Sequence, residues 1–185
     1  MGGQIVVVID SLVTDLLAGA ISFFMAALFA HAGASKWRSP EAYQETVAAV
    51  LGSARAAGGV RLIASAEMVV AALVLLPLSR GVGLLAAGAI LIAYAGAMGW
   101  QLRQGNVNLR CGCSGPASDT RISPELVWRN VLLAAGAFWA TAGVLPGRLE
   151  TTAVAIGLSL VLLCVYAAID QVIQNRQRWL RGVNP

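Results

Sequence analysis

Long apolar runs alternate with short polar stretches along this 185-residue chain. Each run is close to the roughly 20 residues that a helix needs to cross about 30 Å of hydrocarbon at 1.5 Å per residue. The pattern predicts an all-α fold: a polytopic membrane helix bundle of about five transmembrane helices, in a single membrane domain of residues 1–185. The expected spans are residues 12–34, 62–78, 82–102, 126–145 and 151–169, and a polar, basic tail follows at 171–185.

A short amphipathic helix is expected in the polar stretch of residues 35–61, between the first two spans. Ser39, Pro40 and Glu41 follow the order favoured at a helix start: a serine suited to the N-cap, a proline in the first helical position and an acidic residue in the first turn. Residues 123–125 repeat this order, so the fourth span is expected to begin there.

Composition indicates lipid, not water, as the solvent for most of the chain. Hydrophobic residues make up 58% of the sequence, charged residues make up 12%, and the mean hydropathy is +0.74. A soluble domain carries about twice that share of charge. The net charge of +4 does not indicate nucleic-acid binding, because the Lys and Arg residues lie in short loops and the tail. No positive charge precedes Lys36, as a cleavable signal peptide would require, so the first span is expected to be retained.

The basic residues predict the orientation in the membrane, because cytoplasmic loops carry an excess of Lys and Arg. With five spans, Arg80 and Arg148 fall on one side and eleven basic residues fall on the other. We therefore expect a bacterial inner membrane protein whose C-terminus and third loop, between the third and fourth spans, are cytoplasmic. The eleven residues are Lys36, Arg38, Arg55, Arg61, Arg103, Arg110, Arg121, Arg129, Arg176, Arg178 and Arg181.

The strongest candidate for chemistry is the pair Cys111 and Cys113, which one glycine separates in the third loop. A disulfide in so small a ring is strained and therefore easily reduced, and Arg110 beside it favours the reactive thiolate. A zinc site needs about four ligands. Only His31 and Cys164 remain to complete one, both inside expected spans, so no metal site is expected and Cys164 is interpreted as a small buried hydrophobe.

Several ionisable or polar side chains lie inside the apolar runs or at their edges. His31, Lys36 and Glu67 are expected near the same membrane face as the third loop. Such groups usually face the bundle interior or a cavity, where they suit a proton relay, a quinone contact or a structural ion pair of Glu67 with Lys36 or Arg129. Arg129 and Asn130 suit an interfacial anchor or a support for the third loop. No motif indicates a cofactor, and a bound quinone stays an open alternative.

Two further patterns are typical of membrane helices. Ala89, Ala93 and Ala97 recur at helical spacing, with Gly88 and Gly96 close by, and small residues let helices approach closely in lipid. Tryptophans near the ends of the expected spans predict an aromatic belt at the membrane interface; they are Trp37, Trp100, Trp128 and Trp179.

Four segments together resemble the MauE family of methylamine-utilisation membrane proteins, within the wider DoxX-like group. The resemblance covers about residues 16–140, and a phenylalanine is common in the family where this chain has Ser114. The segments are Ala34-Ser35-Lys36-Trp37, Ser65-Ala66-Glu67, Cys111-Gly112-Cys113-Ser114-Gly115, and Ile122-Ser123 with Trp128-Arg129-Asn130.

The resemblance implies an accessory role in the maturation of methylamine dehydrogenase. The implied client is its small periplasmic β-subunit, which is rich in disulfides and carries tryptophan tryptophylquinone, and the implied partner is a thioredoxin-like protein of the MauD type. Carried over by position, Cys111 and Cys113 are the redox pair, Lys36 and Glu67 the intramembrane polar positions, and Arg129 with Asn130 the supporting motif.

Three functional hypotheses follow. The first is a thiol–disulfide relay through the two cysteines that supports processing, disulfide formation or transport of the β-subunit. The second is a proton or small-molecule carrier that uses His31 and Glu67, and the third is a non-catalytic anchor for the thioredoxin-like partner. The relay meets a conflict, because the implied client is periplasmic whereas the charges predict that the third loop is cytoplasmic. Three arrangements stay open: the pair exchanges reducing equivalents from the inner side, the topology is inverted, or the loop folds back into the bundle.

Overall fold

The computed structural model describes residues 2–106, 121–145 and 147–183, and these residues contain helices and no strand. Residues 107–120 of the third loop, which include Arg110, Cys111 and Cys113, lie outside the described residues. The elements are α1 (Gly2–Arg38), α2 (Glu41–Leu51), a short 3-10 helix η1 (Ser53–Arg55), α3 (Ala56–Leu75), α4 (Arg80–Arg103), α5 (Pro124–Ala140) and α6 (Leu149–Val183).

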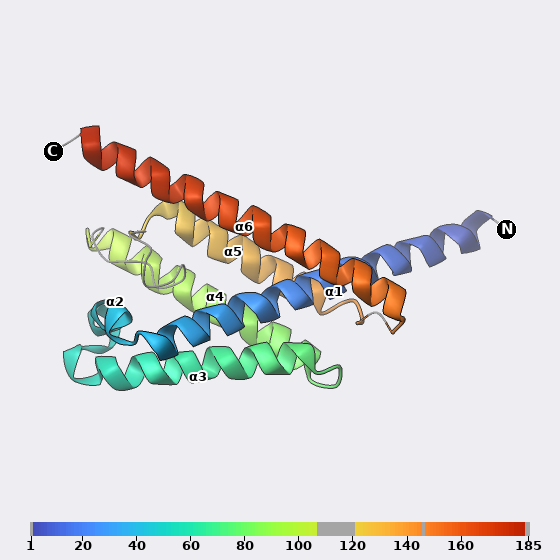
Figure 1. Ribbon diagram of the computed structural model, residues 1–185, viewed down its shortest axis with the longest axis horizontal. Helices are drawn as coiled ribbons and strands as arrows, with labels where there is room; N and C mark the ends of the chain where they lie inside the picture. Colours follow the sequence, from blue (N-terminus) through green and yellow to red (C-terminus); the bar gives the residue numbers. More distant parts are fainter. Residues whose placement is uncertain (1, 107–120, 146, 184–185) are drawn as a thin grey trace.

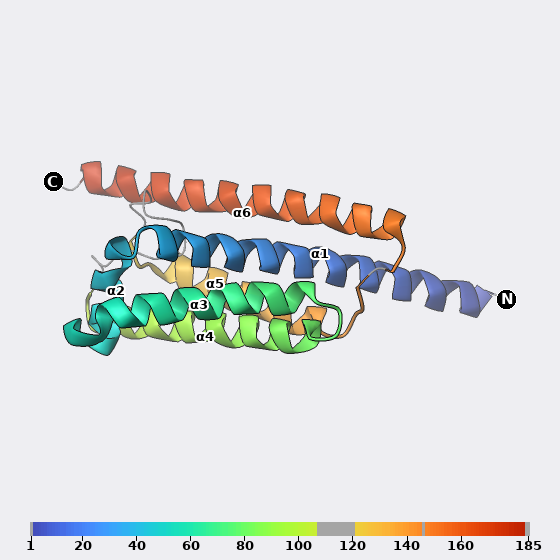
Figure 2. The same cartoon turned by 60° about the horizontal axis from the view of Figure 1, so that its bottom comes forward.

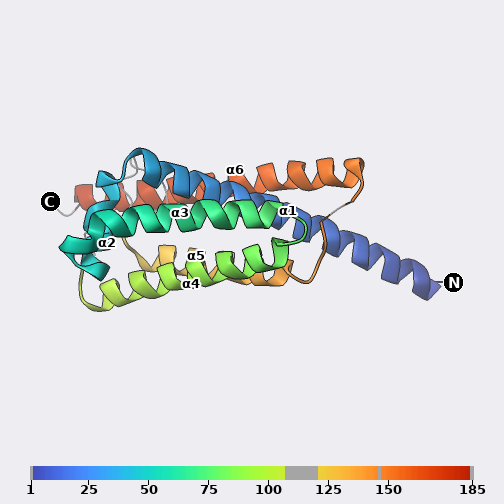
Figure 3. The same cartoon turned by 90° about the horizontal axis from the view of Figure 1, so that it is seen from below.

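The five long helices run along one common axis in alternating directions, and α2 lies across one end of the bundle (Figures 1 and 2). We call this the loop end, because α4 ends there at Arg103 and α5 begins there at Pro124. Helix α1 packs against α3, α5 and α6, while α4 packs against α3 and α5. The view from below shows α3 and α4 side by side with α5 behind them (Figure 3).

The expected all-α membrane helix bundle is confirmed. Within the described residues, four helices are long and apolar enough to cross a membrane. Helix α5 has 17 residues, which corresponds to about 26 Å at 1.5 Å per residue and is the shortest length usual for a span. The four candidate spans are Asp10–Arg38, Ser53–Leu75, Arg80–Arg103 and Leu149–Trp179.

The two expected helix starts differ in detail. Before α2, Pro40 itself occupies the N-cap position, so the assignment of Ser39 as the N-cap was wrong; the Ser39 backbone N–H instead donates to the carbonyl of Ser35 at the end of α1. Before α5, Ser123 is the extended N-cap residue and Pro124 begins the helix, as the sequence predicted. Neither start has a side-chain cap.

Small residues set the close contacts inside the bundle, although not all of those that the sequence indicated. A Cβ added at Gly88 of α4 would lie 2.5 Å from the ring of Phe138 on α5, so a larger residue fits there only if that ring moves. Ala89 and Ala93 are exposed, and an added Cβ at Gly96 would meet nothing within 4 Å. The expected helix contact is therefore found at Gly88 but not at Ala89, Ala93 or Gly96, and Ala97 is half-buried.

Helix α6 lies on the outside of the bundle and packs mainly against α1. Most of its large apolar side chains are exposed, as expected for a helix surrounded by lipid. Cys164 is exposed as well, so its interpretation as a buried hydrophobe was wrong. The exposed tryptophans of the expected interface belt all lie toward the loop end of their helices: Trp37, Trp100, Trp128 and Trp179.

At the opposite end, Arg80 is a buried structural group, although the sequence suggested a loop charge. Its Nε donates to Ser22 Oγ at 2.9 Å, and its two terminal nitrogens donate to the carbonyls of Ala140 and Gly143 at 2.5 and 2.6 Å. Ala140 ends α5, so its carbonyl lacks a partner within the helix, and Gly143 lies in the turn that follows. The Arg80 side chain therefore ties α1, α4 and the end of α5 together.

Candidate functional site

The described ends of the third loop are both held by side-chain contacts. After α4, Gly105 adopts a positive φ of 77°, which suits glycine, and the chain turns back on itself. The backbone N–H of Asn106 donates to the Gln101 carbonyl at 3.0 Å, and its side chain donates to Gln101 Oε1 at 2.8 Å. Gln101 Nε2 also donates to the Ala49 carbonyl of α2 at 3.0 Å. The loop therefore leaves from a junction of α4 and α2.

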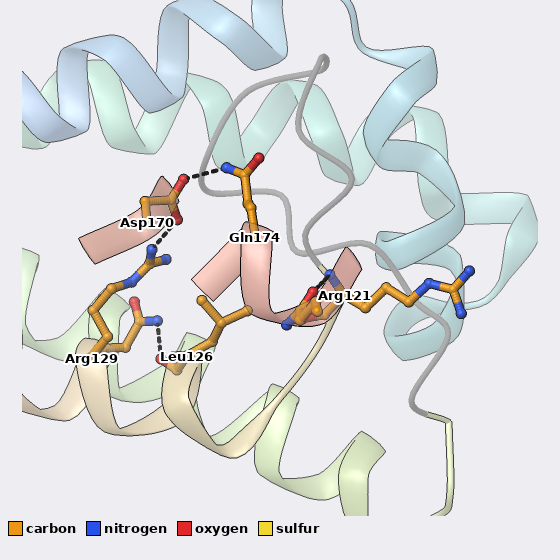
Figure 4. Close-up of polar contacts among 7 residues, drawn as sticks. Arg121, Leu126, Arg129, Asp170 and Gln174 are labelled. Carbon is orange, nitrogen blue, oxygen red and sulfur yellow. Dashed lines mark hydrogen bonds and ion pairs between the residues drawn. The ribbon is translucent and has the colours of Figure 1, made fainter. Parts of the chain in front are cut away.

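The returning end of the loop is paired with α6. Gln177 accepts a hydrogen bond from the Arg121 backbone N–H at 2.9 Å and donates one to the Arg121 carbonyl at 3.1 Å. The two bonds hold the backbone of Arg121 in one orientation, three residues before α5 begins (Figure 4).

Below this anchor, a buried ion pair joins α5 to α6. Arg129 Nη1 lies 2.7 Å from Asp170 Oδ1, and both side chains are at least nine-tenths buried. Gln174 donates to the other carboxylate oxygen at 2.8 Å (Figure 4). The Arg129 guanidinium lies 4.9 Å from the ring centroid of Tyr166. The neighbouring Asn130 donates to the Leu126 carbonyl at 2.8 Å. Of the two roles suggested for Arg129 and Asn130, burial excludes an anchor in the lipid interface.

A second buried ion pair joins α1 to α3. Lys36 Nζ lies 2.8 and 2.9 Å from the two carboxylate oxygens of Glu67, and Tyr94 of α4 donates its hydroxyl to the same carboxylate at 2.6 Å. Lys36 is near the C-terminal end of α1, and helical side chains lean toward their N-terminus, so the ammonium reaches down into the bundle. The structure thus pairs Glu67 with Lys36 and not with Arg129.

Glu67, one member of the second ion pair, lines a small pocket together with Tyr166, whose ring lies beside the Arg129 guanidinium. Glu67 and Tyr94 line it from one side, and Asn130 and Tyr166 line it from the other. Its volume of about 20 Å³ is enough for about one water molecule. Polar side chains from α3, α4, α5 and α6 therefore meet in the half of the bundle that carries the loop end.

The structure does not bring His31 into this arrangement. Its side chain is exposed on α1, and it makes no hydrogen bond or ion pair in the part of the chain that the structure describes. In the same part of the chain, no group of three or more His, Cys, Asp and Glu side chains is placed to hold a metal ion.

The sequence did not indicate several contributors to the site, among them Tyr94, Asp170 and Gln177. Asp170 had a usable signal, because an acid at the end of an apolar run lies at the same membrane depth as Arg129 at the start of another. Tyr94 and Gln177 carry no such sequence signal, because a tyrosine in a span and a glutamine in a polar tail are both common without a functional role.

The apolar helices and the polar groups buried among them define a multi-pass helical membrane protein. The family model described as methylamine utilisation protein MauE matches residues 14–143. The chain therefore belongs to the MauE family, and it is an accessory membrane protein of methylamine utilisation. A comparison with curated proteins and one with solved structures each found no match.

Proposed function

We propose that this protein supports the maturation of methylamine dehydrogenase through a thiol–disulfide relay at Cys111 and Cys113. The observation that carries the proposal is the C-x-C pair with Arg110 beside it, in the third loop of a chain that belongs to the MauE family. Arg110 favours the thiolate, the form that attacks disulfides. The anchors at Gln101 and Gln177 support the proposal, because they fix the points between which the pair is held.

In the proposed relay, a client thiolate attacks one sulfur of the Cys111–Cys113 disulfide, whose S–S bond breaks as a mixed disulfide forms. The second client thiolate then displaces that cysteine, so the client gains a disulfide and the pair becomes a dithiol. Two electrons and two protons have moved from the client to the pair. The pair passes both to the disulfide of a thioredoxin-like partner of the MauD type, which restores the starting state.

We also propose that the loop end faces the cytoplasm of a bacterial inner membrane. Six arginines at this end are exposed, whereas at the opposite end Arg148 is exposed and Arg80 is buried. The six are Arg38, Arg55, Arg61, Arg103, Arg176 and Arg178. This distribution supports the positive-inside orientation. In this orientation the pair exchanges with thiol proteins on the inner side and acts on the β-subunit through them.

Replacing both Cys111 and Cys113 by serine should abolish maturation of the β-subunit, because the relay then has no sulfur to form a bond. The measurement is the disulfide state of the β-subunit and the activity of methylamine dehydrogenase in cells that carry the variant. The matched control is Cys164→Ser, which removes an exposed thiol of α6 and should leave both unchanged. Normal disulfides with the double variant would exclude the relay and leave the anchor function.

The carrier hypothesis has its own test. It requires Glu67→Gln to abolish function in cells while the double-serine variant still works. The structure gives it less support, because His31 is exposed on α1 and Glu67 is already paired with Lys36.

A further inference from the structure

A cavity between α2, α3 and α4 has no place in the proposed relay. Its volume is about 450 Å³, within the range of about 300–1,000 Å³ that is usual for small-molecule sites. The walls are almost wholly apolar, with side chains such as Val47, Ile63, Ile90 and Met98. An apolar space of this size in a membrane protein suits an apolar molecule.

The cavity opens sideways toward the lipid. Ala66 of α3 and Ala93 of α4 both line it and are both exposed, and each lies well inside a candidate span. On α2, Val50 and Leu51 line it and are also exposed. The small alanines leave a gap between the two helices where larger side chains would close it. A molecule dissolved in the bilayer reaches the cavity without crossing water.

One buried charge lies at the inner wall of the cavity. Lys36 lines it, is only 5% exposed, and carries three N–H groups. Two hydrogen bonds to the carboxylate of Glu67 are found for Lys36 Nζ among the described residues, and this nitrogen also lies 5.4 and 5.9 Å from the ring centroids of Tyr43 and Tyr94. A third N–H is therefore left for a ligand oxygen in a wall where aromatic rings already favour the positive charge. A buried donor gains from an acceptor, so a ligand oxygen at this wall is favoured.

We propose that this cavity binds a lipid-soluble molecule with an apolar body and at least one carbonyl oxygen, which enters from the bilayer between α3 and α4. The carbonyl oxygen accepts a hydrogen bond from Lys36, and the apolar body fills the space along Ile90 and Ala93. Two classes of ligand have both features: a quinone-type ring with an apolar side chain, and an acyl lipid with an ester. The binding site is independent of the cysteine relay.

The row of alanines on α4 supports this assignment. Ala93 and Ala97 lie one helical turn apart and both line the cavity, while Ala89, one turn further along the same row, does not. The row packs against no helix at Ala89 and Ala93, which are exposed. The small side chains of Ala93 and Ala97 keep the cavity open toward the lipid. This accounts for the small residues at positions where no helix packs against them.

The test measures the thermal midpoint of the full chain, purified in dodecyl maltoside, against increasing amounts of three probes. Decylubiquinone and monoolein each carry a carbonyl group, whereas hexadecane carries none. A ligand that binds the folded state alone raises Tm as its concentration exceeds Kd. We expect a saturable rise with at least one carbonyl probe and a smaller rise with hexadecane. Preference for decylubiquinone indicates a ring-bearing ligand, and preference for monoolein indicates an acyl lipid.

Ala93→Phe should weaken the binding of the effective probe at least tenfold, because the ring occupies the mouth of the cavity. Ala89→Phe is the matched control: the same change on the same helix, outside the cavity, should alter Kd less than twofold. If Ala93→Phe does not fold, Val50→Trp blocks the opening from α2. The proposal is overturned if no carbonyl probe gives a saturable rise, or if the blocking variant binds as tightly as the unchanged protein.

Discussion

Glu67→Leu should destabilise the bundle by about 3–5 kcal/mol, the usual cost of removing one partner of a buried ion pair. The substitution leaves the Lys36 ammonium buried without its carboxylate and removes the acceptor of the Tyr94 hydroxyl. The measurement is the free energy of unfolding in detergent. Glu150→Gln changes an exposed carboxylate at the start of α6 and serves as the control, with an expected effect of about 0.5 kcal/mol or less.

A double variant separates the ion pair from simple packing. Lys36→Met combined with Glu67→Leu removes both charges and keeps apolar side chains of similar length, so it should cost less than either single change. If the free energy of unfolding lost in the double variant equalled the sum of the two single losses, the two side chains would act independently. In that case the pair is not the contact that joins α1 to α3 at this depth.

Asp170→Leu should cost a similar amount, about 3–5 kcal/mol, because it leaves the buried Arg129 guanidinium without its carboxylate. The chain provides its own control in Glu125→Gln, which breaks a second ion pair between α5 and α6. There, Arg176 Nη1 lies 2.6 Å from Glu125 Oε1, but both side chains are exposed. Exposed pairs contribute about 0–1 kcal/mol.

The comparison has a second readout, since both pairs link the same two helices. Protection of α6 from amide hydrogen exchange should fall sharply in Asp170→Leu and little in Glu125→Gln. Equal effects of the two variants would show that the buried ion pair contributes no more than the exposed one, and the expected difference would be wrong.

The fold was predictable because its signal is spread over many residues. Apolar runs near the length of a membrane span leave few alternatives to a helix bundle, and the starts at Pro40 and Pro124 were recognisable within one residue. The sequence indicated two possible partners for Glu67, namely Lys36 and Arg129. Separation along the chain does not show which of the two is close in space; the structure pairs Glu67 with Lys36.

What sequence could not supply is the direction in which each side chain faces. His31, Cys164 and Ala93 all lie in apolar helices, and a buried position was the natural expectation for each. They are exposed because α1, α4 and α6 each leave one face without a neighbouring helix. The cavity depends on that same arrangement, so only the packed structure reveals it.

The most direct test of the central claim uses inside-out membrane vesicles poised at different thiol–disulfide potentials. Cys111 and Cys113 are trapped with a membrane-impermeant maleimide in a Cys164→Ser background, so only the pair is counted. We expect labelling to change reversibly with the potential as a two-electron process. The pair should carry no label at oxidising potentials and two labels per chain at reducing ones. Labelling that does not depend on the potential, or that requires vesicles of the opposite orientation, would contradict a redox pair on the cytoplasmic side.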